Sequence, residues 1–220
     1  MPKKRLIIND HFYAYQFPKS KIRPLQKALH DGLAIARENI QIWKPITIQL
    51  WIGTKKDKLA HNFVSSGDAA GKRTIHITIS RVFLNSRNFS QLQSTITHEY
   101  AHILRNNLRR SKTVLGAAIE EGISCYIQTS LWRAPNYLDI RSLNEKMVRI
   151  IWGKLEAALP KKTAKEKIVW KKEIYRQMLY RLGFGIVRRY VRKNQNVNFH
   201  NLVLTPQSRL IKFANREYGR

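Results

Sequence analysis

The sequence predicts an α+β fold, in which a small β-sheet is followed by a mainly helical second half. Two stretches before residue 80 alternate apolar and polar residues with the period of two that a half-buried strand requires. After residue 90, apolar residues recur every three to four positions, which is typical of helices. With 220 residues, of which 43% are hydrophobic, the chain is long enough to bury a core.

The first half is expected to contain one helix and up to three strands. Residues 21–43 carry apolar residues at helical spacing. Residues 46–52 alternate isoleucine or leucine with polar residues and tryptophan, which predicts a strand, and residues 75–79 repeat this alternation. Between them, residues 60–65 are a candidate strand, and the sequence SGDAAGK at 66–72 is typical of a loop.

Two helices are predicted over residues 90–103 and 114–132. A Ser-x-x-Gln capping box at residues 90–93 begins the first, and apolar residues follow it at helical spacing. The second is apolar on most sides, which predicts a buried helix. Glu120 and Glu121 nevertheless lie in its middle. Burying a carboxylate is costly unless it is paired or binds a metal, and metal binding would explain one of them.

The first of these helices contains His98, Glu99 and His102 in a His-Glu-x-x-His string. At about 3.6 residues per turn, the two histidines project from one face, so both imidazoles can bind a single ion. Glu99 lies at the edge of that face, where it can hold a water molecule without being a ligand. A hydrolytic zinc site needs a third protein ligand from elsewhere in the chain. The plain alternative is two histidines satisfied by ordinary hydrogen bonds.

The string at residues 98–102, followed after eighteen residues by Glu121 and Gly122, resembles the gluzincin metallopeptidases. The spacing is similar to that of their aminopeptidase N branch. The segment from Tyr180 also resembles the Tyr-x-x-Gly/Ser-x-x-x-Val-x-x-Tyr segment of small bacterial gluzincin-like proteins. The Gly-x-Met-Glu-Asn string of the aminopeptidase N branch is absent, so exopeptidase and endopeptidase action both stay open.

The resemblance implies a zincin-like fold in a single catalytic domain over residues 1–220. Its upper lobe, about residues 1–108, would hold a small mixed sheet and the active-site helix. Its lower lobe, about residues 109–220, would be mainly helical. The implied activity is that of a zinc metallopeptidase, with a peptide or protein as substrate.

The resemblance also implies roles for individual residues. Zn²⁺ would be held by His98, His102 and Glu121. Glu99 would be the general base, which takes a proton from the attacking water and passes it to the leaving amine. Glu120 either orients one of the histidines, binds a substrate amine, or is a plain helix carboxylate.

Peptide hydrolysis also requires a donor for the oxyanion of the tetrahedral intermediate. Tyr180 is the first candidate for this catalytic role, and Tyr175, Tyr190 and His200 are the next ones. Most tyrosines at helical spacing are core residues, so a packing role is the alternative for each tyrosine.

The chain is strongly basic, with 41 Lys and Arg against 14 Asp and Glu and a net charge of +27. Such a charge attracts polyanions, either nucleic acid or acidic protein, but specifies no fold. The alternative function is therefore a nucleic-acid-associated basic protein with a zincin fold, acting on nucleic-acid-bound proteins or catalytically inactive. A third alternative is that the protein is a structural partner module. The simplest explanation of the charge is that the basic residues form a solvated surface without a partner.

The remaining sequence features concern location. Cys125 is the single cysteine, so no intramolecular disulfide is expected, which favours a reducing compartment. No signal peptide is evident, and no uncharged apolar run approaches the length of about 18 residues that a membrane helix needs. A cytoplasmic protein without a transmembrane segment is the expectation, and the oligomeric state is not indicated.

Overall fold

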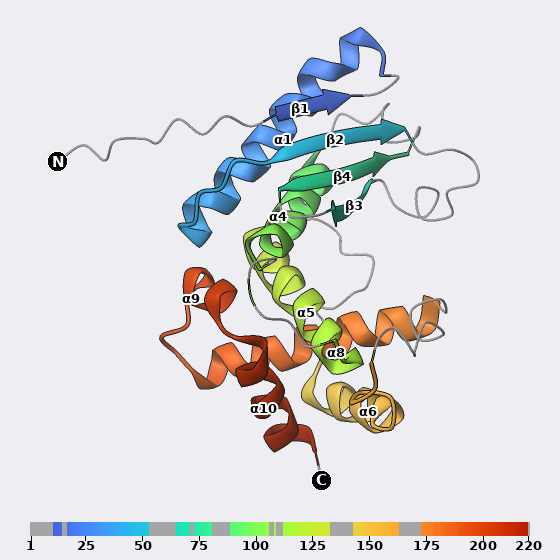
Figure 1. Ribbon diagram of the computed structural model, residues 1–220, viewed down its shortest axis with the longest axis vertical. Coiled ribbons are helices and arrows are strands. Elements are labelled where there is room, and N and C mark those ends of the chain that lie inside the picture. The colour runs from blue at the N-terminus through green and yellow to red at the C-terminus, as the bar shows by residue number, and fades with distance from the viewer. Residues whose placement is uncertain are drawn as a thin grey trace, which may run out of the picture. The chain divides into compact units, whose positions relative to one another are not determined.

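The computed structural model describes residues 11–14, 17–52, 65–70, 73–80, 89–105, 108, 112–132, 143–162 and 173–219. In these residues the protein is mainly helical, with a small sheet (Figure 1). The helices are α1 (Lys19–Ile40), α4 (Ser90–Arg105), α5 (Val114–Leu131), α6 (Glu145–Leu155), α8 (Glu173–Lys193), α9 (Phe199–Leu204) and α10 (Gln207–Tyr218). The strands are β1 (His11–Ala14), β2 (Thr47–Ile52), β3 (Ser65–Ala70) and β4 (Thr74–Ile79).

The chain divides into two compact units, Met1–Asn106 and Asn107–Arg220. The first contains the whole sheet together with α1 and α4, and the second is helical. The expected single catalytic domain, with lobes that meet near residue 108, stays a prediction.

The sheet of the first unit has the strand order β1-β2-β4-β3. β2 pairs in parallel with β1 and β4, and β3 pairs antiparallel with β4. The predicted alternation is confirmed in both central strands, because Ile48, Leu50, Ile75 and Ile77 are each at most 1% exposed. Trp51 points to the other face and is 43% exposed. α4 packs against β3, β4 and α1, so the metal-binding helix predicted from the sequence belongs to the core of this unit (Figure 1).

One local prediction in the first unit is wrong. The SGDAAGK segment, expected to be a loop, provides most of strand β3, which pairs with β4 from Ser65↔Ile79 to Ala70↔Thr74. Small residues and glycine disfavour strands only weakly, and main-chain pairing to a well-formed neighbouring strand overrides that preference. The candidate strand at 60–65 lies outside the described residues except for its last residue. β1 was not expected from the sequence.

The second unit is built around α5, which packs against α8, α9 and α10 (Figure 1). α5 and α8 approach closely where two glycines meet. A Cβ atom at Gly122 would lie 2.1 Å from the carbonyl carbon of Gly183, and a Cβ at Gly183 would lie 1.7 Å from the carbonyl oxygen of Ala118. Both positions therefore require glycine, because the obstructing atoms belong to the backbone and cannot rotate away.

Replacement of Gly122 by alanine is expected to force the two helices apart. We expect Gly122→Ala to lower the free energy of unfolding by roughly 3 kcal/mol or more, as overpacking against a rigid neighbour does. Gly153→Ala is the matched control, because Gly153 is also helical but a Cβ added there would have nothing within 4 Å. That change should be neutral or stabilising by up to about 1 kcal/mol. Urea unfolding measures both, and equal midpoints would contradict the close crossing.

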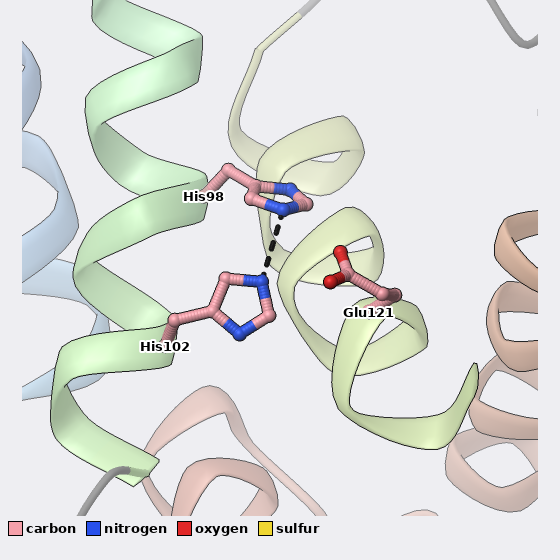
Figure 2. A group of neighbouring side chains, drawn as sticks. All are labelled: His98, His102 and Glu121. Carbon is pink, nitrogen blue, oxygen red and sulfur yellow. Dashed lines mark hydrogen bonds between the residues drawn. The ribbon is translucent and has the colours of Figure 1, made fainter. Parts of the chain in front are cut away.

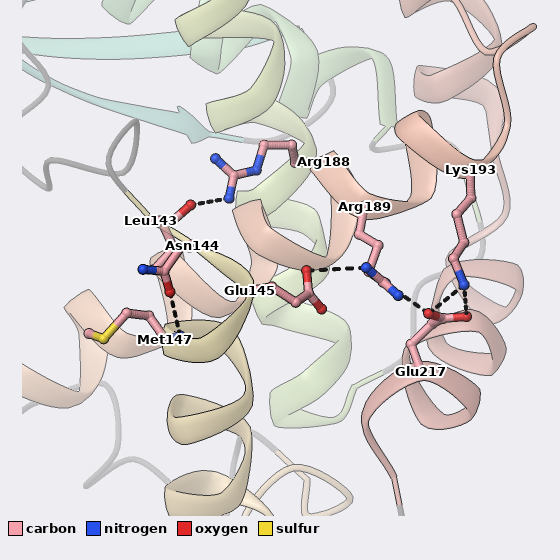
Figure 3. Close-up of polar contacts among 8 residues, drawn as sticks. All are labelled: Leu143, Asn144, Glu145, Met147, Arg188, Arg189, Lys193 and Glu217. Atoms are coloured by element: carbon pink, nitrogen blue, oxygen red, sulfur yellow. Dashed lines mark hydrogen bonds and ion pairs between the residues drawn. The ribbon is translucent and has the colours of Figure 1, made fainter.

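An ion-pair network joins three helices of the second unit (Figure 3). Glu217 of α10 accepts hydrogen bonds from Lys193 Nζ at 2.7 Å and from Arg189 Nε at 2.8 Å, both on α8. Arg189 also lies 3.5 Å from the carboxylate of Glu145 on α6. The hydrogen bonds from Lys193 and Arg189 lower the pKa of Glu217 from 4.5 to about 2. The carboxylate therefore stays ionised and paired well into the acid range.

Glu217→Gln is expected to lower the free energy of unfolding at neutral pH by about 1 kcal/mol, because a neutral amide forms no ion pair with Lys193 and Arg189. The folded-state pKa is depressed, so the stabilisation is present above 4.5 and disappears as the pH falls towards about 2. The gap in unfolding temperature between the metal-free wild type and the variant should close over this pH range. Thermal unfolding at several pH values measures it, with Glu38→Gln as an exposed control. A gap that does not change with pH would contradict the network.

Candidate metal centre

α4 presents the two histidines predicted as ligands. His98 and His102 are each 9% exposed, and their Nε2 atoms lie 3.1 Å apart (Figure 2). In a tetrahedral site with zinc–nitrogen distances of about 2.0 to 2.1 Å, two ligand nitrogens are about 3.3 Å apart. The two imidazoles therefore need to move by only a few tenths of an ångström to share one ion.

Tyr100 holds α4 from its opposite face. At about 100° per residue, its side chain projects roughly 180° from the mean direction of the two histidines. It is fully buried, and its hydroxyl donates to the carbonyl of Ile42 at 2.8 Å and accepts from the amide of Lys44 at 3.0 Å. The guanidinium of Arg37 lies 5.5 Å from the Tyr100 ring centre. These contacts tie the helix to the connection between α1 and β2 and thereby fix its rotation.

Glu99, the predicted general base, lies between His98 and Tyr100 on α4. It is 6% exposed, so its carboxylate is largely shielded from bulk water. Its place on the helix is about 100° from His98, at the side of the ligand face, as the sequence predicted. The role of Glu99 as the general base stays a prediction.

α5 carries the two candidate carboxylates, and its first turn is well defined. The side chain of Thr113 caps the helix by accepting from the amide of Gly116 at 3.1 Å. Glu120 is 5% exposed, and its Oε1 accepts a hydrogen bond from Gln207 Nε2 at 3.0 Å. The same Gln207 nitrogen donates to the carbonyl of Gly116 at 2.7 Å. Glu120 thus takes part in the packing of α10 on α5.

Glu121 is only partly buried and precedes Gly122, the glycine at the α5–α8 crossing. One ligand atom from each of His98, His102 and Glu121 lies within 4.8 Å of the other two (Figure 2). This is the one group of three His, Cys, Asp or Glu residues with such spacing among the residues that the structure describes. Two imidazoles and one carboxylate are the donor set of many catalytic zinc sites, which leave a fourth position open.

The sequence was also compared with known proteins. A family model described as "Predicted Zn-dependent protease (DUF2268)" matches residues 33–212, which is most of the chain and includes every residue of this group. The chain belongs to this family of predicted zinc-dependent proteases. The expected enzyme class and zinc cofactor are thereby confirmed, and the activity implies a protein substrate. No curated protein matches the sequence.

Within this zinc-dependent protease, the candidate oxyanion donors are distributed over the second unit. Tyr175 and Tyr180 lie on α8 and His200 on α9, and all three are partly exposed. Tyr190 is 3% exposed and packs edge-to-face against Phe213, with ring centres 5.2 Å apart, as a core residue does. The catalytic role of Tyr180 stays a prediction.

Sequence reasoning did not single out Tyr100 or Gln207. The only sequence signal for Tyr100 was an aromatic residue between the two histidines. The contacts of the Tyr100 hydroxyl could not be predicted, because their partners lie nearly sixty positions away. No local signal exists for Gln207, which reaches Glu120 across 87 positions. Among the described residues, no helix is both long and apolar enough to cross a membrane.

Proposed function

We propose that this protein is a gluzincin-type peptidase with a zincin-like fold, in which His98, His102 and Glu121 hold zinc. The observation that carries the proposal is the convergence of these three side chains, two from one helix and one from another, with ligand atoms within 4.8 Å. The family match over residues 33–212 supports it, because all three residues lie inside the matched region.

Zinc in such a site supplies a Lewis acid that polarises the substrate carbonyl and acidifies a water molecule. Glu99 takes a proton from the attacking water as the water oxygen bonds to the carbonyl carbon. As the carbon–nitrogen bond breaks, the Glu99 carboxyl returns the proton to the leaving amine. Glu99 is 6% exposed, so bulk water has little access to its side chain. A Tyr180 hydroxyl would donate to the oxyanion.

Removal of the metal tests this function directly. Treatment of the purified protein with a chelator such as 1,10-phenanthroline should abolish hydrolysis of a fluorescently labelled unfolded protein, for example casein. Addition of about one equivalent of Zn²⁺ should restore it, whereas Mg²⁺ and Ca²⁺ should not, since they prefer oxygen-only ligand sets.

Hydrolysis that survives complete metal removal would contradict the proposal. Bound zinc without hydrolysis of any protein substrate would instead favour the alternative of a catalytically inactive zincin fold.

A further inference from the structure

We infer that the exposed face of α10 binds the phosphate backbone of double-stranded nucleic acid without sequence preference. The contacting residues are Arg209, Lys212 and Arg216, which we call the α10 basic stripe. The inference is independent of the metal centre, and it assigns part of the net charge of +27 to one surface of the second unit.

The α10 basic stripe is narrow and continuous. Its three residues follow each other at intervals of three and four, so they project within a sector of about 60° along roughly 10 Å of helix. All three are exposed, and the Arg216 side chain retains 72% of its accessible surface. The opposite face of α10 is buried in the unit through Leu210 and Ala214. The helix is therefore anchored on one side and cationic on the other.

Two of the three cations are partly ordered before any partner binds. The guanidinium of Arg209 lies 5.9 Å from the ring centre of Tyr190, and that of Arg216 lies 5.7 Å from the ring centre of Phe213. Cation–π contacts of this kind restrict the side chain while its N–H groups still face solvent. Ordering a long side chain opposes binding, so this partial order favours contact with a partner.

Among the residues that the structure describes, little of the charge of the stripe is paired. Glu217 is the single acidic residue between positions 174 and 219. Its side chain is only 8% exposed, and Lys193 and Arg189 already donate to it (Figure 3). Arg216 Nε forms a long ion pair with this carboxylate, at 3.8 Å, and in the described part of the chain neither Arg209 nor Lys212 forms an ion pair.

The side chains around the stripe favour nucleic acid over a membrane. The other exposed positions within α10 are Ser208 and Asn215, both polar. A helix that lies in a membrane interface exposes an apolar face, whereas Leu210, Phe213, Ala214 and Tyr218 of α10 are buried and Ile211 is partly buried. Binding of single strands relies on exposed aromatic platforms, and none is present among the exposed residues of α10. Arg, Lys, Ser and Asn are among the residues that contact phosphates in duplexes.

Fluorescence anisotropy with a labelled short duplex DNA of mixed sequence tests the inference on the full chain, with and without zinc. The triple variant Arg209→Gln, Lys212→Gln, Arg216→Gln is compared with Lys19→Gln, Arg23→Gln, Arg73→Gln. The control set removes two Arg and one Lys that are exposed in the first unit, so both proteins lose the same charge. Circular dichroism checks that both variants are folded.

The stripe variant is expected to bind at least about tenfold more weakly between about 50 and 200 mM NaCl, with a log–log salt slope shallower by about 2.7. The control variant should change the affinity for DNA and the salt slope far less. Equal losses in both variants would mean that only net charge matters and would overturn the inference, as would unchanged binding by the stripe variant. Loss of binding to phosphatidylserine vesicles with DNA binding unchanged would assign the stripe to a membrane and would also overturn it.

Discussion

Glu99→Gln is expected to abolish peptide hydrolysis while the protein still binds about one zinc per chain. Glutamine keeps the size of the side chain but cannot accept the proton of the attacking water. General base catalysis contributes about 10²- to 10⁴-fold, so kcat should fall by at least about two orders of magnitude. Turnover of labelled casein and zinc content should be measured on the same preparation.

A suitable control for this change is Glu38→Gln, an exposed glutamate on α1 in the same unit. It removes one carboxylate of the same kind without touching α4, and it should leave kcat and zinc content unchanged. Turnover by Glu99→Gln within about threefold of the wild type would rule out Glu99 as the general base, whose removal should cost at least about a hundredfold. Loss of zinc in this variant would indicate that Glu99 is a ligand instead.

Glu121→Gln is expected to release zinc from the protein. A neutral amide oxygen is a much weaker zinc ligand than a carboxylate, and two histidines alone leave the ion with only two protein ligands. Because even the partners of metal ligands affect affinity by about 10- to 100-fold, loss of a ligand should weaken zinc binding by at least about 100-fold. Elemental analysis after dialysis measures the zinc content, and His98→Ala should give the same result.

The neighbouring carboxylate provides the matched control for this substitution. Glu120→Gln changes the adjacent residue of α5 in the same way, but Glu120 contacts Gln207 and is not part of the three-residue group. This variant should keep about one zinc per chain, because all three ligands of the proposed site are intact. Zinc retained by Glu121→Gln would contradict the ligand assignment. Zinc lost in both variants would indicate damage to α5, which thermal unfolding of the metal-free proteins would show.

Much of the fold was predictable because its signals are local. The strict alternation at Ile48, Leu50, Ile75 and Ile77 corresponds to one buried face of a strand, and all four are buried. The string at 98–102 lies in a helix whose apolar spacing is readable without any tertiary knowledge. The family match confirms the enzyme class and the zinc cofactor that the resemblance to the gluzincins implied.

Other features had no local signal. β3 contains small residues and a glycine, and its strand conformation depends on pairing with β4. The sequence also left three roles open for Glu120, and the hydrogen bond from Gln207 comes from a helix that begins 87 positions later. A residue type at one position carries no information about such a distant partner.

The sequence by itself determined which residues the candidate zinc site contains: two histidines one helical turn apart, Glu99 beside the first of them, and a second helix with an adjacent pair of glutamates. These depend on residue identity and helical periodicity, which are properties of short segments. Only the tertiary structure decided which surfaces the helices bury. It placed Tyr100 behind the histidines, required glycine at Gly122 and Gly183, and left one face of α10 cationic and exposed. The physical reason is that packing and pairing energies arise between segments far apart in the chain, where local preferences no longer decide the outcome.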